Sequence, residues 1–201
     1  SGNRKKVADS PFLESPRPLN PYNLPDSDET KYEPFRIIGH KKVGILSDVH
    51  IPYHNLPALT AAIKYLKKEK VDAVLLNGDT IDCHHLSRFE KDAEKRKFSE
   101  EIKLLNQFFD SLEKTLKCKI YFKIGNHEAR YESYLRQKAG EIADIEDFQF
   151  AKLIRAEQRG ISIIESNQYM KLNKLNGIHG HEFKTGISVP VNIARGLYMK
   201  G

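Results

Sequence analysis

The chain has 201 residues, of which 39% are hydrophobic and 30% are charged, and its formal net charge is +6. No run approaches the roughly 18 apolar residues of a membrane helix, and no signal peptide is evident, so we expect no membrane association. The two cysteines, Cys83 and Cys118, form no disulfide-rich pattern, which favours a cytoplasmic location. The basic balance favours polyanionic partners, nucleic acid above all.

The first 40 residues differ from the rest because they hold six of the nine prolines. These six are Pro11, Pro16, Pro18, Pro21, Pro25 and Pro34. Proline at this density excludes helices and central strands. We therefore expect an extended N-terminal arm over residues 1–40, followed by one domain over residues 41–201.

Strand-like and helical patterns alternate from residue 41 onward. They predict strands at 42–47, 72–77 and 119–124, a helix from Asn55 or Leu56 to Lys70, and a helix at 99–117 with Ser99 as its N-cap. Alternation of this kind is typical of an α/β protein.

The pattern changes in the last third of the chain. Helices are predicted at 129–138 and 147–158, strand-like runs at 161–166, 168–174 and 175–180, and a last short helix at 191–200. Three strands in succession, with no helix between them, predict an antiparallel second sheet that begins after residue 160.

Polar side chains follow four of the predicted strands. Asp48 and His50 follow the first, Asp79 the second, Asn126 the third, and His179 lies at the end of the last run. Residues two apart on an extended segment point to the same side, so Asp48 and His50 can face one point. The Gly-Asp and Gly-Asn pairs after these strands are, each taken alone, ordinary turn sequences. Because open α/β sheets place their sites at the carboxyl ends of strands, the set predicts one shared site.

The order of these motifs resembles the calcineurin-like metallophosphoesterase superfamily. The motifs are D-x-H at 48–50, G-D-x-x-D at 78–82, G-N-H-E at 125–128 and H-G-H at 179–181. The runs SDVHIPYH and GDTIDCHHLSRF are most similar to the phage and prophage-type phosphoesterases. The resemblance implies an αββα sandwich of two sheets. The family's further G-H-x-H motif does not occur before Gly201, so we expect a sandwich that is incomplete at its C-terminus.

The resemblance also implies a centre with two divalent transition metal ions. Asp48, His50 and Asp79 would serve the first ion, and Asp79, Asn126 and His179 the second, with Asp79 as the bridge. Mixed oxygen and nitrogen ligands favour Mn, Fe or Zn over calcium or magnesium. Two such cations lower the pKa of a bridging water, so that hydroxide can attack phosphorus near neutral pH.

The resemblance gives further residues a role around the metals. His127 would contact the phosphate and protonate the leaving group, so we predict His127 and Asp79 as catalytic. Asp82 is expected to orient a neighbour such as His127. His181 fits a supporting role at the site and a core position equally well.

Three basic residues lie near the motifs. Arg88, Arg130 and Lys123 are candidates for holding phosphate, and Arg has the forked geometry suited to it. The alternative for each of them is a solvated charge.

Two functions follow from this pattern. The first is a metal-dependent phosphoesterase acting on mono- or diesters of nucleic acids, nucleotides, phosphoproteins or small molecules. The basic charge favours nucleic acid, whereas the lack of an evident aromatic and basic patch stands against it. The alternative is a truncated or inactive protein of this fold that acts as a binding module. An open edge of the second sheet would also allow a homodimer.

Overall fold

The computed structural model describes residues 22–25, 33–87, 96–182, 191–192 and 194–195. It divides into two compact units, residues 1–31 and 32–201. All helices and strands named below belong to the second unit. No helix in the described part of the chain is long and apolar enough to cross a membrane.

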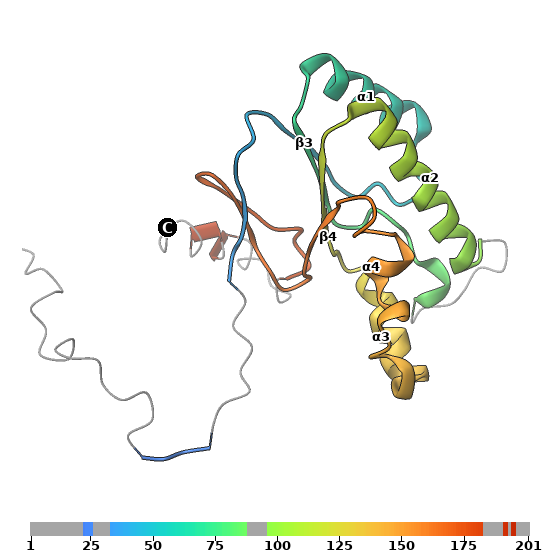
Figure 1. The fold of residues 1–201 in the computed structure, drawn as a ribbon, viewed down its shortest axis with the longest axis vertical. Coiled ribbons are helices and arrows are strands. Elements are labelled where there is room, and N and C mark those ends of the chain that lie inside the picture. Colours follow the sequence, from blue (N-terminus) through green and yellow to red (C-terminus); the bar gives the residue numbers. More distant parts are fainter. Residues whose placement is uncertain (1–21, 26–32, 88–95, 183–190, 193, 196–201) are drawn as a thin grey trace, which may run out of the picture. The chain divides into compact units, whose positions relative to one another are not determined.

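The larger sheet has four parallel strands in the order β2–β3–β4–β5, of which Figure 1 labels β3 and β4. They are Val43–Leu46, Ala73–Asn77, Lys119–Lys123 and Ser162–Ile164. The first three lie within the predicted strands at 42–47, 72–77 and 119–124. Because all four strands are parallel, their carboxyl ends lie along one edge of the sheet.

In the described part of the chain, four named helices accompany this sheet. They are α1 (Leu56–Glu69), α2 (Phe98–Leu116), α3 (Ala129–Lys138) and α4 (Phe150–Leu153), with short 3₁₀ turns η2 (His84–Leu86), η3 (Gly140–Ile142) and η4 (Glu146–Phe148). The Asn55 side chain caps α1 by accepting from the Ala58 N–H. The prediction that Ser99 caps α2 is wrong, because the helix begins at Phe98, one residue before Ser99. The ring of Phe98, its first residue, stacks on Tyr131 of α3.

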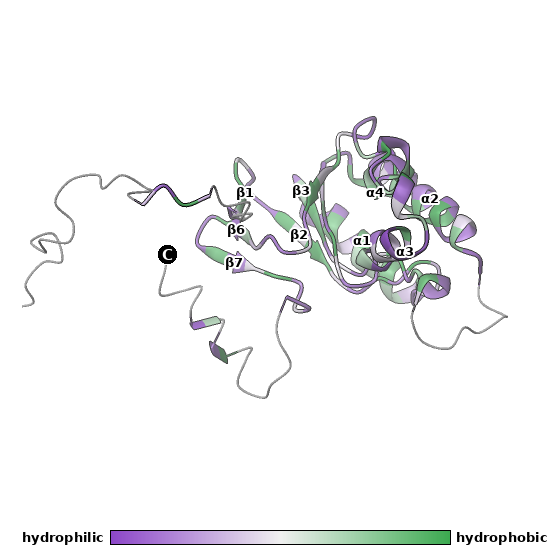
Figure 2. Cartoon of the chain, turned by 90° about the horizontal axis from the view of Figure 1, so that it is seen from below, coloured by the Kyte–Doolittle hydropathy of each residue, from purple (hydrophilic) through white to green (hydrophobic). Residues whose placement is uncertain are grey.

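Both faces of the larger sheet are buried, and successive residues of a strand point alternately to one face and the other. Val74 and Phe122 face a core built with the helices, to which α2 contributes Leu105 and Phe109. The intervening residues face a second core shared with the other sheet. Its buried members are Ile37, Ala73, Leu75, Tyr121, Ile164 and Met170. Figure 2 shows the smaller sheet on one side of β2 and β3 and the labelled helices on the other. The predicted α/β architecture of two stacked sheets is therefore confirmed.

The smaller sheet has the order β1–β6–β7. Its strands are Phe35–Ile37, Met170–Leu172 and Leu175–Gly177. Strands β6 and β7 are antiparallel, whereas β1 pairs with β6 in parallel. Strand β1 comes from the last part of the predicted arm, and its edge position is compatible with the nearby prolines. The predicted dimer through an edge of this sheet stays a prediction.

Two predictions for the last third of the chain are wrong. The run at 161–166 does not open the second sheet, because β5 joins the first sheet parallel to β4. The predicted helix at 147–158 is reduced to η4 and one turn of α4, followed by turns. Because the helical part of the connection between β4 and β5 is so short next to β5, the sequence pattern did not indicate that β5 belongs to the same parallel sheet. The predicted helix at 191–200 lies mostly outside the described residues, although 191, 192, 194 and 195 are helical.

Candidate metal centre

The loops that follow β2 and β3 are joined through their backbones. The N–H of Asp48 donates to the carbonyl of Gly78 at 3.2 Å, and that of His50 donates to the carbonyl of Asp79 at 3.0 Å. Asp48, His50 and Asp79 all have positive φ angles, between 50° and 55°. Non-glycine residues rarely adopt this conformation, and such strain concentrates at functional sites.

Asp48, Asp79 and His179 form the first group of side chains that could hold a metal ion. One ligand atom from each lies within 4.8 Å of the others. His179 Nε2 is 3.3 Å from Asp79 Oδ2 and 3.3 Å from Asn126 Oδ1. The His179 and Asp79 side chains are only 5% and 6% exposed. Four of the five predicted ligands thus meet at one point.

The hydrogen bonds of His179 suit a metal ligand. Its Nδ1 is 2.7 Å from the carbonyl oxygen of Asn77, which can only accept a hydrogen bond, so Nδ1 carries the proton. In the neutral ring, Nε2 then presents a lone pair toward the oxygens of Asp79 and Asn126. A divalent cation at this point would take the lone pair of Nε2 and the two oxygens as ligands. The donor set therefore fits a divalent metal with oxygen and nitrogen ligands.

His50, Asp82 and His127 form a second such group. His50 Nδ1 lies 3.0 Å from Asp82 Oδ1, and His127 Nδ1 donates to the main-chain carbonyl of Asp82 at 2.7 Å. Burial raises the pKa of Asp82, but the hydrogen bonds from His127 and His50 outweigh it and lower the pKa to about 2. Asp82 is therefore a carboxylate that orients both imidazoles.

The two groups adjoin through Asp79 and His127. The main-chain N–H of His127 donates to Asp79 Oδ1 at 2.9 Å, and its Nε2 lies 3.7 Å from Asp79 Oδ2. The rings of His50 and His127 are 4.5 Å apart between centroids. All five predicted ligands thus belong to one continuous cluster. Within it, His50 groups with Asp82 and His127 rather than with Asp48 and Asp79, and the division of ligands between two ions stays a prediction.

Arg130 lies against His127 rather than apart from the site. Its guanidinium donates to His127 Nε2 at 3.0 Å and to the carbonyl of Asp82 at 3.1 Å. Burial lowers the pKa of His127, yet the hydrogen bonds to Asp82 and the charge of Asp79 raise it overall, with Arg130 acting in the opposite direction. Arg130 thus brings a fixed positive charge to the cluster.

Glu128 holds the loops together, a role that the sequence analysis missed. Its side chain is fully buried and accepts from four main-chain N–H groups at 2.7–3.2 Å. These donors belong to Asp79, Thr80, Ile81 and Gly125. Burial and the charge of Asp79 raise the pKa of Glu128, while the N–H groups favour its carboxylate. An acidic residue directly before a helix was the available signal.

Two glycines are required where elements of the site approach each other. A Cβ at Gly125 would lie 2.3 Å from Asp79 Oδ1. A Cβ at Gly78, whose φ is +81°, would lie 2.4 Å from Nδ1 of the His179 ring. Both glycines of the predicted motifs therefore allow close contact between ligand loops.

Lys123 does not hold phosphate, which corrects the prediction. It is completely buried and donates to the carbonyls of Glu165 and Ser166 at 2.8 and 2.6 Å. It also pairs with Glu182 at 3.1 Å, and Glu182 accepts from the main-chain N–H groups of His179 and Gly180. The buried pair therefore braces the turn that carries His179.

His181 and Arg88 complete the predicted set. His181 Nε2 lies 2.7 Å from the Ser166 hydroxyl oxygen, and its ring centroid is 5.3 Å from that of His179. It thus stands beside the cluster in a supporting position. Arg88 lies outside the described residues. His84 is a further neighbour, with Nδ1 at 3.8 Å from Asp82 Oδ2.

Comparison with known proteins agrees with this geometry. The sequence model of the calcineurin-like phosphoesterase family matches residues 41–193. The chain is also 28% identical over 130 residues to the Gene 54 protein of Mycobacterium phage L5, an alignment that covers 62% of this chain and 51% of that protein. The chain thus spans about half the length of this relative. The similarity to a phage protein supports the predicted phage-type branch. Because the family match covers most of the chain and every predicted metal ligand, the chain belongs to the calcineurin-like phosphoesterase family.

Proposed function

We propose that this protein hydrolyses phosphate mono- or diesters with the help of two divalent transition metal ions. The observation that carries the proposal is the convergence on His179 Nε2 of the oxygens of Asp79 and Asn126, each at 3.3 Å. These atoms come from three separate loops, and hydrogen bonds through Glu128 and Asn77 hold them in place. An arrangement fixed in this way, with buried negative charge, suits a bound cation.

The residues divide between binding the ions and binding the ester. As the resemblance implies, Asp48, His50 and Asp79 would hold one ion, and Asp79, Asn126 and His179 would hold the other. Manganese, iron and zinc all suit this ligand set. When bound, such ions neutralise phosphate charge and make hydroxide available near neutral pH.

His127 and Arg130 are assigned to the ester itself. Hydrolysis joins a water oxygen to phosphorus and breaks the bond between phosphorus and the leaving alcohol, which takes up a proton. The imidazole of His127, 3.7 Å from Asp79 Oδ2, is placed at the centre of the cluster to interact with that leaving oxygen. The guanidinium of Arg130 can turn from His127 onto a phosphate oxygen, for which its planar fork is suited.

The two cysteines support a proposal for the cellular location. Cys83 is buried, and both Cys83 and Cys118 are free thiols. Free thiols of this kind support a reducing compartment, and we place the protein in the cytoplasm.

A chelation experiment tests the proposed function. The protein would be stripped of metal, and turnover of p-nitrophenyl phosphate and of bis(p-nitrophenyl) phosphate would be measured before and after addition of Mn²⁺, Fe²⁺ or Zn²⁺. We expect turnover only after metal is restored. Turnover that persists in the chelator would contradict the proposal. Tight metal binding without hydrolysis of any ester would favour the alternative of a binding module.

A further inference from the structure

A hollow of about 610 Å³ opens beside the candidate metal centre. Asn126, Arg130 and His181 of the cluster and its surroundings line this hollow, and the rest of its wall is largely one face of α3. This volume falls in the range of pockets that take ligands larger than a phosphate group. The hollow therefore has room for the part of a substrate that extends away from the metal centre.

The residues that α3 gives to this hollow form two rows at helical spacing. One row is Ala129, Ser133 and Gln137, and the other is Arg130, Tyr134 and Lys138. Residues four apart lie on the same face of a helix, and each step advances about 6 Å along the axis. The second row thus places an arginine at the metal centre, an aromatic ring one turn further, and a lysine two turns further.

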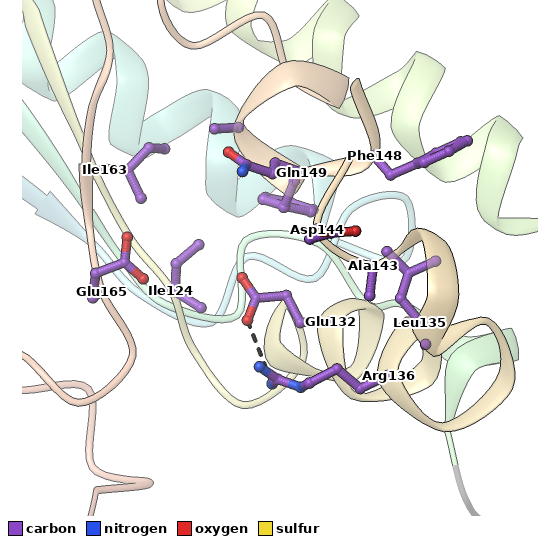
Figure 3. A pocket seen from close by; sticks show the side chains of 13 residues that line it. Ile124, Glu132, Leu135, Arg136, Ala143, Asp144, Phe148, Gln149, Ile163 and Glu165 are labelled. Carbon is purple, nitrogen blue, oxygen red and sulfur yellow. Dashed lines mark ion pairs between the residues drawn. The ribbon is translucent and has the colours of Figure 1, made fainter. Parts of the chain in front are cut away.

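The charge on the two sides of α3 is opposite. None of the described residues that line this hollow is acidic, whereas Arg130 and Lys138 are basic. On the other side of α3, a second hollow of about 490 Å³ is lined by Glu132, Asp144 and Glu165. Figure 3 shows this second hollow, where Glu132 pairs with Arg136 at 3.5 Å. The hollow beside the metal centre is therefore the one suited to an anionic chain.

From this row we propose that the substrate is a single-stranded nucleotide chain that lies along α3. Arg130 would contact the scissile phosphate, the ring of Tyr134 would stack on the next base, and Lys138 would bind the following phosphate. Tyr134 is 39% exposed, so its ring is accessible to a ligand. In a nucleotide chain a base branches from the sugar between successive phosphates, and in the row an aromatic ring likewise stands between two basic residues. The inference rests on the proposed function because it extends the same site.

An aromatic and basic patch was not predicted because its members are separated in the sequence. Arg130, Tyr134 and Lys138 stand four residues apart with acidic and neutral residues between them. Only the helix brings them onto one face. Base stacking on an aromatic ring combined with basic contacts to the backbone is the usual way in which proteins bind single strands.

Binding of a labelled oligonucleotide tests the inference without requiring hydrolysis. A fluorescent single-stranded oligothymidylate would be titrated in EDTA and followed by anisotropy. We expect Tyr134→Ala to weaken binding roughly tenfold, whereas Tyr134→Phe keeps the stacking face and most of the affinity. For Lys138→Ala, the slope of the logarithm of the binding constant against the logarithm of the salt concentration should be smaller by about one than for the wild type. Arg136→Ala, on the opposite face of α3, is the matched control and should bind like the wild type.

A second measurement uses the metal-loaded protein. For Tyr134→Ala and Lys138→Ala, the loss in kcat/KM on the oligonucleotide should exceed the loss on bis(p-nitrophenyl) phosphate, which has no base and no second phosphate.

Three results would overturn the inference. The first is equal affinity of Tyr134→Ala and wild type for the oligonucleotide. The second is a loss of affinity in Arg136→Ala as large as in Tyr134→Ala. The third is a phosphopeptide that binds more tightly than the oligonucleotide and depends on Tyr134. Hydrolysis of the bis-ester without oligonucleotide binding would overturn this inference alone, whereas oligonucleotide binding without hydrolysis would overturn only the proposed reaction.

Discussion

The imidazole of His179 donates its Nδ1 proton to the main-chain carbonyl oxygen of Asn77 across 2.7 Å. In return, the side-chain amide of Asn77 donates to the carbonyl of Ile178 at 3.1 Å. Asn77 ends β3 of the larger sheet, and His179 follows β7 of the smaller sheet. These two hydrogen bonds therefore attach the ligand from one sheet to the edge of the other, and they fix which nitrogen faces the metal.

The contact between Gly78 and His179 gives the first prediction. In Gly78→Ala, the new Cβ would lie 2.4 Å from the ring, which must move away. We expect metal affinity to fall by at least roughly tenfold, the effect typical of residues that orient a ligand. Calorimetric titration with Mn²⁺ or Zn²⁺ measures this change.

Gly39→Ala is a matched control for that variant. Gly39 has a φ of +82°, close to the +81° of Gly78, but nothing lies within 4 Å of its added Cβ. Both variants should lose about 1–2 kcal/mol of stability from the left-handed backbone. Only Gly78→Ala should lose metal affinity, and an equal loss in Gly39→Ala would contradict the argument.

The second prediction concerns the carboxylate of Glu128, which accepts two main-chain N–H groups on each oxygen. In Glu128→Gln, the amide nitrogen must face two of these donors whichever way it turns. We expect the free energy of unfolding to fall by about 2–4 kcal/mol in urea denaturation. Glu132→Gln, in the helix that follows Glu128 and in an exposed ion pair with Arg136, should change it by about 0.5 kcal/mol or less. A Glu128→Gln variant as stable as that control would show that the four hydrogen bonds contribute little.

The local sequence pattern predicted much of the fold and the position of the site. Helix α3 has the predicted bounds of 129–138, and strands β2, β3 and β4 end where ligand residues begin. These features depend on neighbours in sequence, because hydrophobic period and glycine-containing turns are local signals.

The features that the sequence did not predict depend on contacts between distant segments. Lys123 lies on β4, where a lysine suggests an exposed position, and only the fold reveals its buried partner Glu182. The parallel pairing of β5 with β4 and of β1 with β6 leaves no trace in the periodicity of either strand. The grouping of His50 with Asp82 likewise follows from the path of the loops.

The third prediction concerns the buried carboxyl of Glu101, which is 0% exposed. Burial raises its pKa to about 7, although the main-chain N–H groups of His84 and Cys83 act in the opposite direction. The folded state holds this proton more tightly than the unfolded state. The contribution of the Glu101 carboxyl to stability is therefore fully present below about pH 4.5 and is lost as pH rises through 7.

Removal of this titration should change how stability depends on pH. From pH 5 to 8, the free energy of unfolding of Glu101→Gln should rise by about 2–3 kcal/mol relative to that of the wild type. Urea denaturation at several pH values measures this difference. Glu100→Gln, at the exposed neighbouring position, provides the control. A constant difference between Glu101→Gln and wild type across this range would disprove the raised pKa.

The central claim is that Asp79 holds a metal ion at the meeting point of three loops and that phosphoester hydrolysis depends on it. The most direct measurement is kcat/KM of Asp79→Asn on bis(p-nitrophenyl) phosphate in Mn²⁺, with calorimetric metal binding and circular dichroism on the same sample. Asp72→Asn, just before the opposite end of β3, removes the same charge away from the site. The account predicts an unchanged fold, weakened metal binding and a loss on the order of a hundredfold or more for Asp79→Asn, with near-wild-type activity for Asp72→Asn. Full turnover and metal binding in Asp79→Asn would contradict it.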